Sequence, residues 1–482
     1  MPICDPLYLA LLIPVVLVFY FLPAGPWRPV FILLVSYVYY LSFPAVFFPA
    51  LLFVSAVAYA GGLLIARSRE TRFFPSVVTT VLLVCFAPLI FYKYISSLLL
   101  TSPDLAGADH GWVLPVGLSF YTFAAAGYLA DVALNVTREQ RQPLNVALFC
   151  GFFPIVTMGP VPRRAMFEQL QFRRGFTADR GWRAFTEILV GAVVKLVFAD
   201  HLAAPADAVY ADLASSPPLE QLVGSIFGVY YVYADWLGYS LLAIGSARLL
   251  GVDIPDNFRQ PFLSTTIPEF WRSWNISLLN WFRDYIFTPL RLALRRHPRL
   301  CTPVAVFVTF VLLGVWHAAG WGYLLYGVAN GVLVVLSQWT LARRDRFWRF
   351  VGCPPFVVKL CRVPITFLLV TLTLPFVRAA NVSEAFHVYG GIFSPRIVAN
   401  LVNLFRETPD PAMGVFHHIH FGVGFLMIAA LVLGDVIMLV KPKFVLSPPI
   451  LMRAAVCAIC LVAVMSYAMS PSTARPFVYF QY

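Results

Sequence analysis

Long apolar stretches without a charged side chain dominate this sequence and limit the folds open to it. One of them, residues 302–342, contains no Asp, Glu, Lys or Arg and a single histidine, His317. About 20 apolar residues suffice for a helix to cross the ~30 Å hydrocarbon layer of a membrane. With 60% hydrophobic and only 12% charged residues over 482 positions, the chain has more apolar surface than one soluble core would bury. We predict an all-α polytopic membrane protein.

The net charge of +12 comes from basic clusters in the short segments between the apolar stretches. Such clusters mark cytoplasmic loops under the positive-inside rule. They lie at residues 67–72, 138–141, 163–183, 291–299, 343–349 and 441–443. The basic residues do not sit on a soluble module with aromatic stacking platforms, so we predict no nucleic-acid partner.

The alternation of these loops predicts about eleven helical passes or partial passes, with both chain termini outside the cytoplasm. Residues 1–24 lack the short apolar core and cleavage site of a signal peptide and are predicted to remain as the first span. Residues 146–161 include Pro154, Gly159 and Pro160 and are predicted to be re-entrant. Residues 201–220 are predicted to form an outside loop, and residues 251–298 to form helices near the lipid headgroups. The other predicted spans are residues 30–41, 44–66, 75–100, 112–136, 185–198, 222–250, 304–320, 321–340, 363–377, 415–440 and 451–469. We treat residues 1–482 as one membrane domain.

His317 is a titratable ring inside an apolar stretch, where a charge is costly and even a neutral imidazole needs hydrogen-bond partners. One interpretation is a structural histidine that bonds a backbone carbonyl, and the other is a functional site. Its neighbours Gly314, Ala318, Ala319 and Gly320 are small, so substrate or another backbone could approach the ring closely. Because imidazole transfers protons near neutral pH, we favour the functional site.

Five sequence stretches carry more information than any single motif. They are LPVGLSFYTFAAAGYLADV (residues 114–132), FFPIVTMGPVPR (152–163), YADWLGYSLLAIGSARLLG (233–251), IPDNFRQPFLSTTIPEFWRSWNISLLNWFRDYIFTPL (254–290) and GVWHAAGWGYLLYGVANG (314–331). Together they resemble the membrane-bound O-acyltransferases, in particular the bacterial branch that includes the membrane subunit of alginate O-acetylation and the D-alanyl transferase of teichoic acids. The motif core covers about residues 110–335.

The resemblance implies a ring of tilted helices, with re-entrant and interfacial helices, around a central tunnel that has a catalytic histidine at its constriction. His317 falls on the position of that histidine. The donor would be acetyl-CoA or another acyl thioester, carried by coenzyme A or by an acyl carrier, and would approach from the cytoplasm as a substrate rather than as a bound cofactor. The acceptor would approach from the other face. We therefore expect an O-acyltransferase of the bacterial cytoplasmic membrane.

Two asparagines stand where the family commonly has histidine. Asn275 does so in the sequence FWRSWNIS, and Asn330 does so in the pair Asn330-Gly331. Asparagine can position a group by hydrogen bonding but cannot transfer a proton near pH 7. The resemblance places Asn275 at the catalytic centre and Trp274, Trp316 and Asn330 along the tunnel.

Three charged residues are further candidates for substrate binding. Asp235 lies in a predicted span, where it could orient tunnel groups or pair with an arginine. Arg272 and Arg283 lie in the predicted interfacial region, and a guanidinium group forms bidentate contacts with phosphate. The phosphates of coenzyme A and those of lipid headgroups both suit these two arginines.

The segment 471–482 ends in the aromatic sequence FVYFQY, and its prolines should stop the preceding helix. An aromatic anchor at the membrane interface is one interpretation. The segment also resembles an F-x-Y-x-x-F-type tail of the bacterial branch or of its small partner proteins, whose tyrosine is proposed to accept the acyl group. Tyr479 matches that tyrosine, and Tyr482 stands where phenylalanine is usual.

The resemblance also implies an extracytoplasmic partner, a serine-type acyltransferase similar to the SGNH enzymes, which would pass the acyl group to a secreted polysaccharide. Two other classes stay open: a transporter, which also uses broken helices, and a non-catalytic scaffold of a polysaccharide export complex. Cys457 and Cys460 are interpreted as packing residues. His417, His418 and His420 have no carboxylate nearby, so we expect no metal site.

Overall fold

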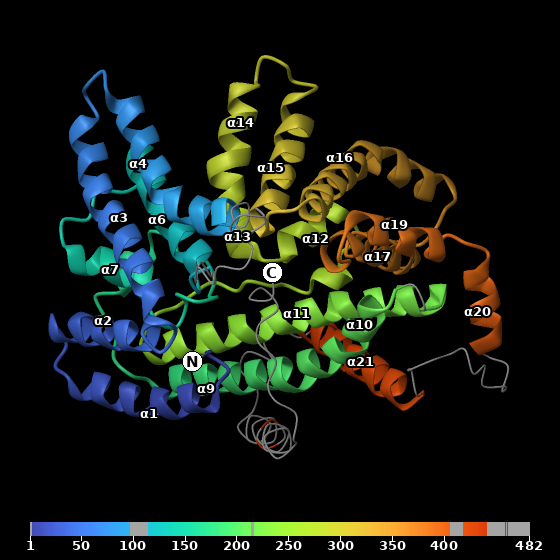
Figure 1. The fold of residues 1–482 in the computed structure, drawn as a ribbon, viewed down its shortest axis with the longest axis horizontal. Coiled ribbons are helices and arrows are strands. Elements are labelled where there is room, and N and C mark those ends of the chain that lie inside the picture. Colours follow the sequence, from blue (N-terminus) through green and yellow to red (C-terminus); the bar gives the residue numbers. More distant parts are fainter. Residues whose placement is uncertain are drawn as a thin grey trace, which may run out of the picture. The chain divides into compact units, whose positions relative to one another are not determined.

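The predicted all-α fold is confirmed. The computed structural model describes residues 2–96, 114–213, 216–404 and 418–440, together with Ala458 and Cys460. Over these ranges the chain forms helices and no strand (Figure 1). Within them, six helical runs are long and apolar enough to cross a membrane, and two apolar helices are shorter. The chain is thus a multi-pass membrane protein, and the total of about eleven passes stays a prediction.

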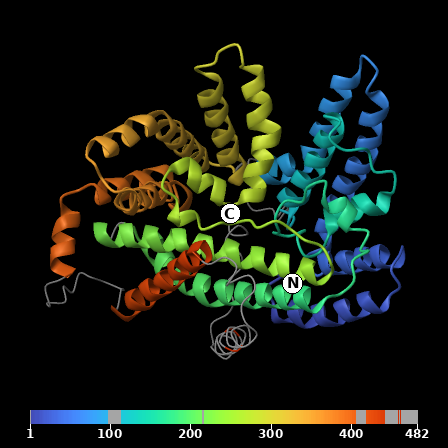
Figure 2. The same cartoon turned by 180° about the vertical axis from the view of Figure 1, so that it is seen from behind.

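The chain divides into two compact units, which are residues Met1–Ala192 with Gly238–Asn257 and Val193–Leu237 with Phe258–Tyr482. Helices of the first unit are α1 (Pro6–Phe21), α2 (Trp27–Tyr40), η1 (Ala45–Phe47), α3 (Phe48–Ser68), α4 (Phe74–Ile90), η2 (Phe91–Ile95), α6 (Leu118–Ala133), α7 (Pro143–Gly151), α8 (Met166–Gln169) and most of α9 (Ala178–Val193). In this unit α3, α4 and α6 pack against one another (Figure 1, Figure 2).

Small residues explain why α6 forms the centre of the first unit. The sequence Ala-Ala-Ala-Gly at residues 124–127 is fully buried, as are most other residues of the helix. On α3, a Cβ at Gly62 would lie 2.6 Å from the hydroxyl oxygen of Tyr128, and a Cβ at Gly61 would lie 3.2 Å from Leu129. Close helix packing of this kind is the usual way in which membrane helices associate, because lipid offers no hydrophobic driving force between them.

The segment 146–161 is a short helix followed by irregular, buried backbone. α7 ends at Gly151, and residues 152–161 are buried without forming a helix. The N–H group of Phe153 donates to the Ser36 hydroxyl at 3.1 Å. Irregular backbone at membrane depth requires such protein partners. The broken helix therefore agrees with the prediction, while the path of the segment through the membrane stays a prediction.

The second unit contains the remaining described helices, both long and short. They are η3 (Val194–Ala199), α10 (Asp200–Ala211), most of α11 (Pro218–Leu249), η4 (Pro261–Leu263), α12 (Ile267–Ser273), α13 (Ile276–Phe282), η5 (Arg283–Phe287), α14 (Thr288–Ala293), α15 (Cys301–His317), α16 (Trp321–Phe350), α17 (Pro355–Thr371), α18 (Pro375–Arg378), α19 (Val382–Ile392), α20 (Arg396–Leu404) and α21 (His418–Val440). The predicted interfacial region 251–298 contains short helices from η4 to α14, and α14 stands beside α15, which follows the region (Figure 1, Figure 2).

The predicted outside loop at residues 201–220 is wrong in its first half. α9, η3 and α10 form one helical run, Ala178–Ala211, with a π-helical turn at η3. We expected a loop from residue 201 because residues 201–220 contain three negative charges and no Lys or Arg. The structure instead buries Asp200 next to Lys195, with 2.6 Å between the carboxylate and the ammonium group. A buried and paired charge does not require a loop, so the helix continues.

The α15–α16 hairpin is built on contact between two backbones. A Cβ at Gly314 would lie 2.4 Å from the carbonyl oxygen of Tyr323, and a Cβ at Gly327 would lie 2.5 Å from that of Phe310. Neither backbone oxygen can move without shifting its helix. The two glycines therefore fix the distance between α15 and α16.

We expect Gly327→Ala to destabilise the protein by about 1–3 kcal/mol, because the added methyl group overpacks this contact. The measurement is thermal unfolding of the purified protein in detergent. Gly434→Ala in α21 is the matched control, since a Cβ there meets nothing within 4 Å. Equal melting temperatures for the two variants would show that α15 and α16 can move apart without loss of stability.

Candidate functional site

His317 is the last residue of α15 and is surrounded by aromatic rings. Its imidazole centroid lies 4.7 Å from that of Trp316, 5.8 Å from Tyr326 and 6.4 Å from Tyr323. Trp316 is buried, whereas His317 is half-buried. The rings restrict the orientation of the imidazole by packing, and His317 as a whole is partly exposed.

The spacing of residues on α16 brings the ring partners to one side. Tyr323, Tyr326 and Asn330 follow each other at intervals of three and four residues, so they share one face of the helix. We did not single out the two tyrosines from the sequence. The same helical spacing, applied to the residues after His317, could have found them.

Asn330 adds a polar group to this face. Its side chain is fully buried, and its amide nitrogen donates to the Tyr326 carbonyl at 2.9 Å. Among the residues that the structure describes, the Oδ1 atom of Asn330 has no hydrogen-bond partner. A buried acceptor without a partner costs about 1–3 kcal/mol. Such a group is therefore a candidate to bind a ligand.

Trp271 on α12 supplies a matching donor. Its ring lies 5.0 Å from Phe310 of α15 and 6.5 Å from Tyr326. Its indole N–H is buried and has no acceptor in the described part of the chain. Glu269 stabilises the start of α12, because its carboxylate accepts hydrogen bonds from the backbone and side chain of Thr265 at 2.8 and 2.7 Å. Sequence reasoning gave no role to Trp271 or Glu269.

Asn275 and Trp274 have clear positions between α12 and α13. Asn275 adopts φ of +43°, in the left-handed region that asparagine tolerates better than most residues. This conformation gives Asn275 a backbone role in addition to any role at the catalytic centre. Trp274 belongs to an aromatic cluster, with its ring 5.1 Å from Phe258 and 5.4 Å from Phe270. Tunnel contacts for either residue stay a prediction.

Arg272 and Arg283 have exposed side chains. Arg283 pairs with the neighbouring carboxylate of Asp284 at 2.8 Å. Exposed guanidinium groups are available to an anionic ligand. These exposed positions suit both the phosphates of the acyl donor and the phosphates of lipid headgroups as ligands of the two arginines.

Asp235 on α11 pairs with a lysine, where we had considered an arginine. Its carboxylate lies 2.7 Å from the ammonium group of Lys195, which also contacts Asp200 at 2.6 Å. The side chains of Lys195 and Asp235 are fully buried, and that of Asp200 is 5% exposed. We call Lys195, Asp200 and Asp235 the buried ion cluster. The pairing with Lys195 gives Asp235 a structural partner within the second unit, and its role in the tunnel stays a prediction.

A second polar contact attaches α11 to α21. The Tyr233 hydroxyl lies 3.0 and 3.1 Å from the two carboxylate oxygens of Asp435. Tyr233 and Asp235 are two residues apart and so project from different sides of the helix. The same part of α11 is therefore held by Asp435 on one side and Lys195 on the other.

The remaining predicted site residue, Tyr479, lies outside the described residues, as do Cys457 and His417. The side chains of His418 and His420 also lie outside the described part of the structure. The candidate site accordingly consists of His317, Trp316, Tyr326, Asn330 and Trp271.

Fold and site together define a multi-pass helical membrane protein with a half-buried imidazole at the end of an apolar helix. The family model of the membrane-bound O-acyltransferases matches residues 32–372, and the chain belongs to this family. It is therefore an O-acyltransferase.

The names of three similar proteins indicate three different acceptors. A probable alginate O-acetylase of Pseudomonas aeruginosa is 32% identical over 396 residues, which are 80% of this chain and 74% of the relative. A peptidoglycan O-acetyltransferase of Helicobacter pylori is 26% identical over 66% of this chain and 65% of the relative. A teichoic acid D-alanyltransferase of Bacillus subtilis is 26% identical over 49% of this chain and 62% of the relative.

Proposed function

We propose that the protein transfers an acetyl group from a cytoplasmic thioester, acetyl-CoA, to an acceptor outside the cytoplasm, for O-acetylation of a secreted polysaccharide. The proposal places the protein in the bacterial cytoplasmic membrane. The observation that carries it is that Tyr326 packs against both His317, with 5.8 Å between ring centroids, and Trp271, with 6.5 Å. The Trp271 N–H and the oxygen of Asn330, one helical turn after Tyr326, are buried and have no partner among the described residues. The family assignment favours this enzyme over a transporter or a scaffold.

His317 acts as the general base in this proposal. Its unprotonated ring nitrogen takes the proton of an attacking hydroxyl group, whose oxygen then forms a bond to the thioester carbonyl carbon. The C–S bond breaks, and the thiolate of coenzyme A leaves and takes up the proton. The Trp271 N–H can donate to an oxygen, and the Asn330 oxygen can accept from a donor group of a substrate.

The attacking hydroxyl in the proposal is that of Tyr479. A phenol with a pKa of about 10 is a weak nucleophile unless a base removes its proton. The resulting aryl ester keeps a good leaving group, so the acetyl group stays activated. A serine-type, SGNH-like acyltransferase outside the cytoplasm then accepts the acetyl group and passes it to a sugar hydroxyl of the polysaccharide.

The variant Tyr479→Phe should lose polysaccharide acetylation by at least about 100-fold, because the nucleophilic oxygen is absent. The measurement is the acetyl content of the secreted polymer in cells that express the variant at the level of the parent. Tyr482→Phe is the matched control and should keep its activity, since phenylalanine is usual at that position. Normal acetylation by Tyr479→Phe would rule out the relay but not the acyltransferase.

A labelling experiment tests the proposed function as a whole. Purified protein incubated with acetyl-CoA labelled in the acetyl group should become covalently labelled, and Tyr479→Phe should not. Passage of label into the lumen of proteoliposomes without covalent transfer would indicate a transporter. The absence of both covalent label and transport, together with normal polymer acetylation in cells that express His317→Ala, would indicate a scaffold.

A further inference from the structure

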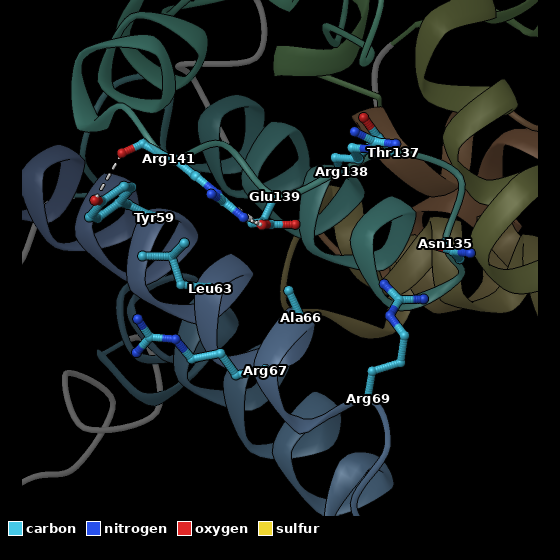
Figure 3. A pocket seen from close by; sticks show the side chains of 10 residues that line it. All are labelled: Tyr59, Leu63, Ala66, Arg67, Arg69, Asn135, Thr137, Arg138, Glu139 and Arg141. Carbon is cyan, nitrogen blue, oxygen red and sulfur yellow. Dashed lines mark hydrogen bonds and ion pairs between the residues drawn. The ribbon is translucent and has the colours of Figure 1, made fainter.

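The first unit contains a pocket lined by four arginines, far in the sequence from His317. The pocket has a volume of about 750 Å³ and lies where the end of α3 meets the segment 134–142 that follows α6. Figure 3 shows Arg67 and Arg69 at the α3 side and Arg138 and Arg141 on the segment 134–142. We call it the basic pocket.

Positive charge exceeds negative charge in the basic pocket. Glu139 is the one acid among the described residues that line it. Its carboxylate pairs with Arg141 at 3.2 Å. A hydrogen bond from its own backbone N–H, together with Arg141, lowers the pKa of Glu139 below its usual value, so the carboxylate is ionised at neutral pH. The lining thus carries four guanidinium groups and one carboxylate.

Hydrogen bonds hold the segment 134–142 in place. The Gln140 N–H donates to the Tyr128 hydroxyl at 2.8 Å, and the Tyr59 hydroxyl donates to the Arg141 carbonyl at 3.2 Å. Both tyrosines belong to helices of the first unit, and Tyr128 is almost fully buried. The backbone that carries Arg138 and Arg141 is therefore fixed by side chains from α3 and α6.

The turn after α6 is equally well defined. The N–H groups of Val136 and Thr137 donate to the Asp131 carbonyl at 2.8 and 3.2 Å. Asn135 has φ of +58°, in the left-handed region that asparagine tolerates. A turn with satisfied backbone groups keeps its shape without a ligand, which lowers the entropy cost of binding one.

The side chain of Arg69 is also held in place before any ligand binds. Its guanidinium donates to the Val132 carbonyl at 2.7 Å, and its side chain is half-buried. One of its five N–H groups is used in this bond, which leaves others for a ligand. Arg67, Arg138 and Arg141 are exposed, so an anion can reach them from outside.

The ligand chemistry follows from the guanidinium groups and the location of the pocket. Guanidinium groups bind phosphate oxygens in bidentate geometry, more specifically than lysine does. Clusters of arginine at the ends of apolar helices face the cytoplasm under the positive-inside rule. Leu63 and Ala66 of α3 add an apolar wall to the pocket. We propose that the basic pocket binds a phosphate group at the cytoplasmic surface of the membrane.

Two sources can supply such a phosphate: the headgroup of an anionic phospholipid, or a soluble phosphorylated compound. The apolar wall favours the phospholipid, because a lipid brings glycerol and acyl chains next to its phosphate. The experiment has one arm for each source. The first arm measures phosphatidylglycerol retained by the full-length protein, using native mass spectrometry after extraction from nanodiscs of phosphatidylglycerol and phosphatidylcholine. The second measures binding of adenosine 3′,5′-bisphosphate in neutral detergent by titration calorimetry.

The test variant is Arg67→Gln/Arg138→Gln, which removes two exposed guanidinium groups without touching the bonds that hold the segment 134–142. We expect it to weaken binding by at least about tenfold in one of the two arms. The matched control is Arg295→Gln/Arg299→Gln, which changes the net charge equally at exposed positions of the second unit. It should bind within about twofold of the parent.

A third variant changes the affinity in the opposite direction. Glu139→Gln removes the acid that competes for Arg141, so binding should become about two- to fivefold tighter in the same arm. Loss of retained lipid in the first arm supports the phospholipid, and loss in the second arm supports the soluble compound. The proposal is overturned if the parent binds in neither arm, or if the pocket variant and its control bind alike.

Discussion

Replacement of His317 by alanine is expected to reduce acyl transfer by about 10²–10⁴-fold, the usual contribution of a general base. The measurement is transfer from labelled acetyl-CoA by the purified protein. Stability should change little, because the ring is half-buried at the end of α15 and its removal leaves no closed cavity. The melting temperature in detergent checks that expectation.

Two further variants separate proton transfer from other roles of His317. His317→Gln keeps a hydrogen-bonding side chain of similar length but cannot take a proton near pH 7, so it should be as inactive as the alanine variant. His297→Ala removes an exposed histidine after α14 and should keep full activity. Substantial activity in His317→Gln would assign this ring to hydrogen bonding rather than to base catalysis.

The second large effect concerns the buried ion cluster. Lys195→Met leaves Asp200 and Asp235 buried together without the cation that contacts both. Removal of one partner from a buried ion pair costs about 3–5 kcal/mol, and we expect a loss of stability in that range. Denaturant-induced unfolding in mixed micelles measures it.

The charges in the buried ion cluster predict how strongly each variant destabilises the protein. Asp235→Asn keeps one carboxylate with one ammonium group, so it should destabilise the protein less than Lys195→Met does. Arg183→Met is the control for loss of an exposed ion pair, since Arg183 and Asp179 lie 3.0 Å apart on the surface of α9. Its cost should be below about 0.5 kcal/mol. If Lys195→Met is no less stable than Arg183→Met, the cluster does not hold the helices together.

The sequence predicted the features that depend on local pattern. The apolar stretch around His317 predicted the two helices that form α15 and α16, and the prolines and glycine of residues 146–161 predicted a broken helix. Both follow from hydropathy and from backbone chemistry within a few residues. The all-α fold and the family follow from the same signals, repeated along the chain.

Features that depend on distant contacts were missed. The continuation of the helix beyond residue 198 was missed, and the partner of Asp235 lies 40 positions away, at Lys195. The Trp271 N–H is a candidate ligand-binding group because its ring packs against Phe310 and Tyr326, which lie on other helices. Pairing across helices depends on tertiary packing, which no short window of sequence contains.

The glycine contact between α15 and α16 divides the surroundings of His317 into a rigid part and an adaptable part. Main-chain atoms set the spacing of the hairpin at Gly314 and Gly327, so no rotamer change widens it. Trp271, by contrast, belongs to a separate short helix and meets Tyr326 through its ring, at 6.5 Å between centroids. Engineering for bulkier acyl groups should therefore begin with smaller residues at position 271, and leave the hairpin intact.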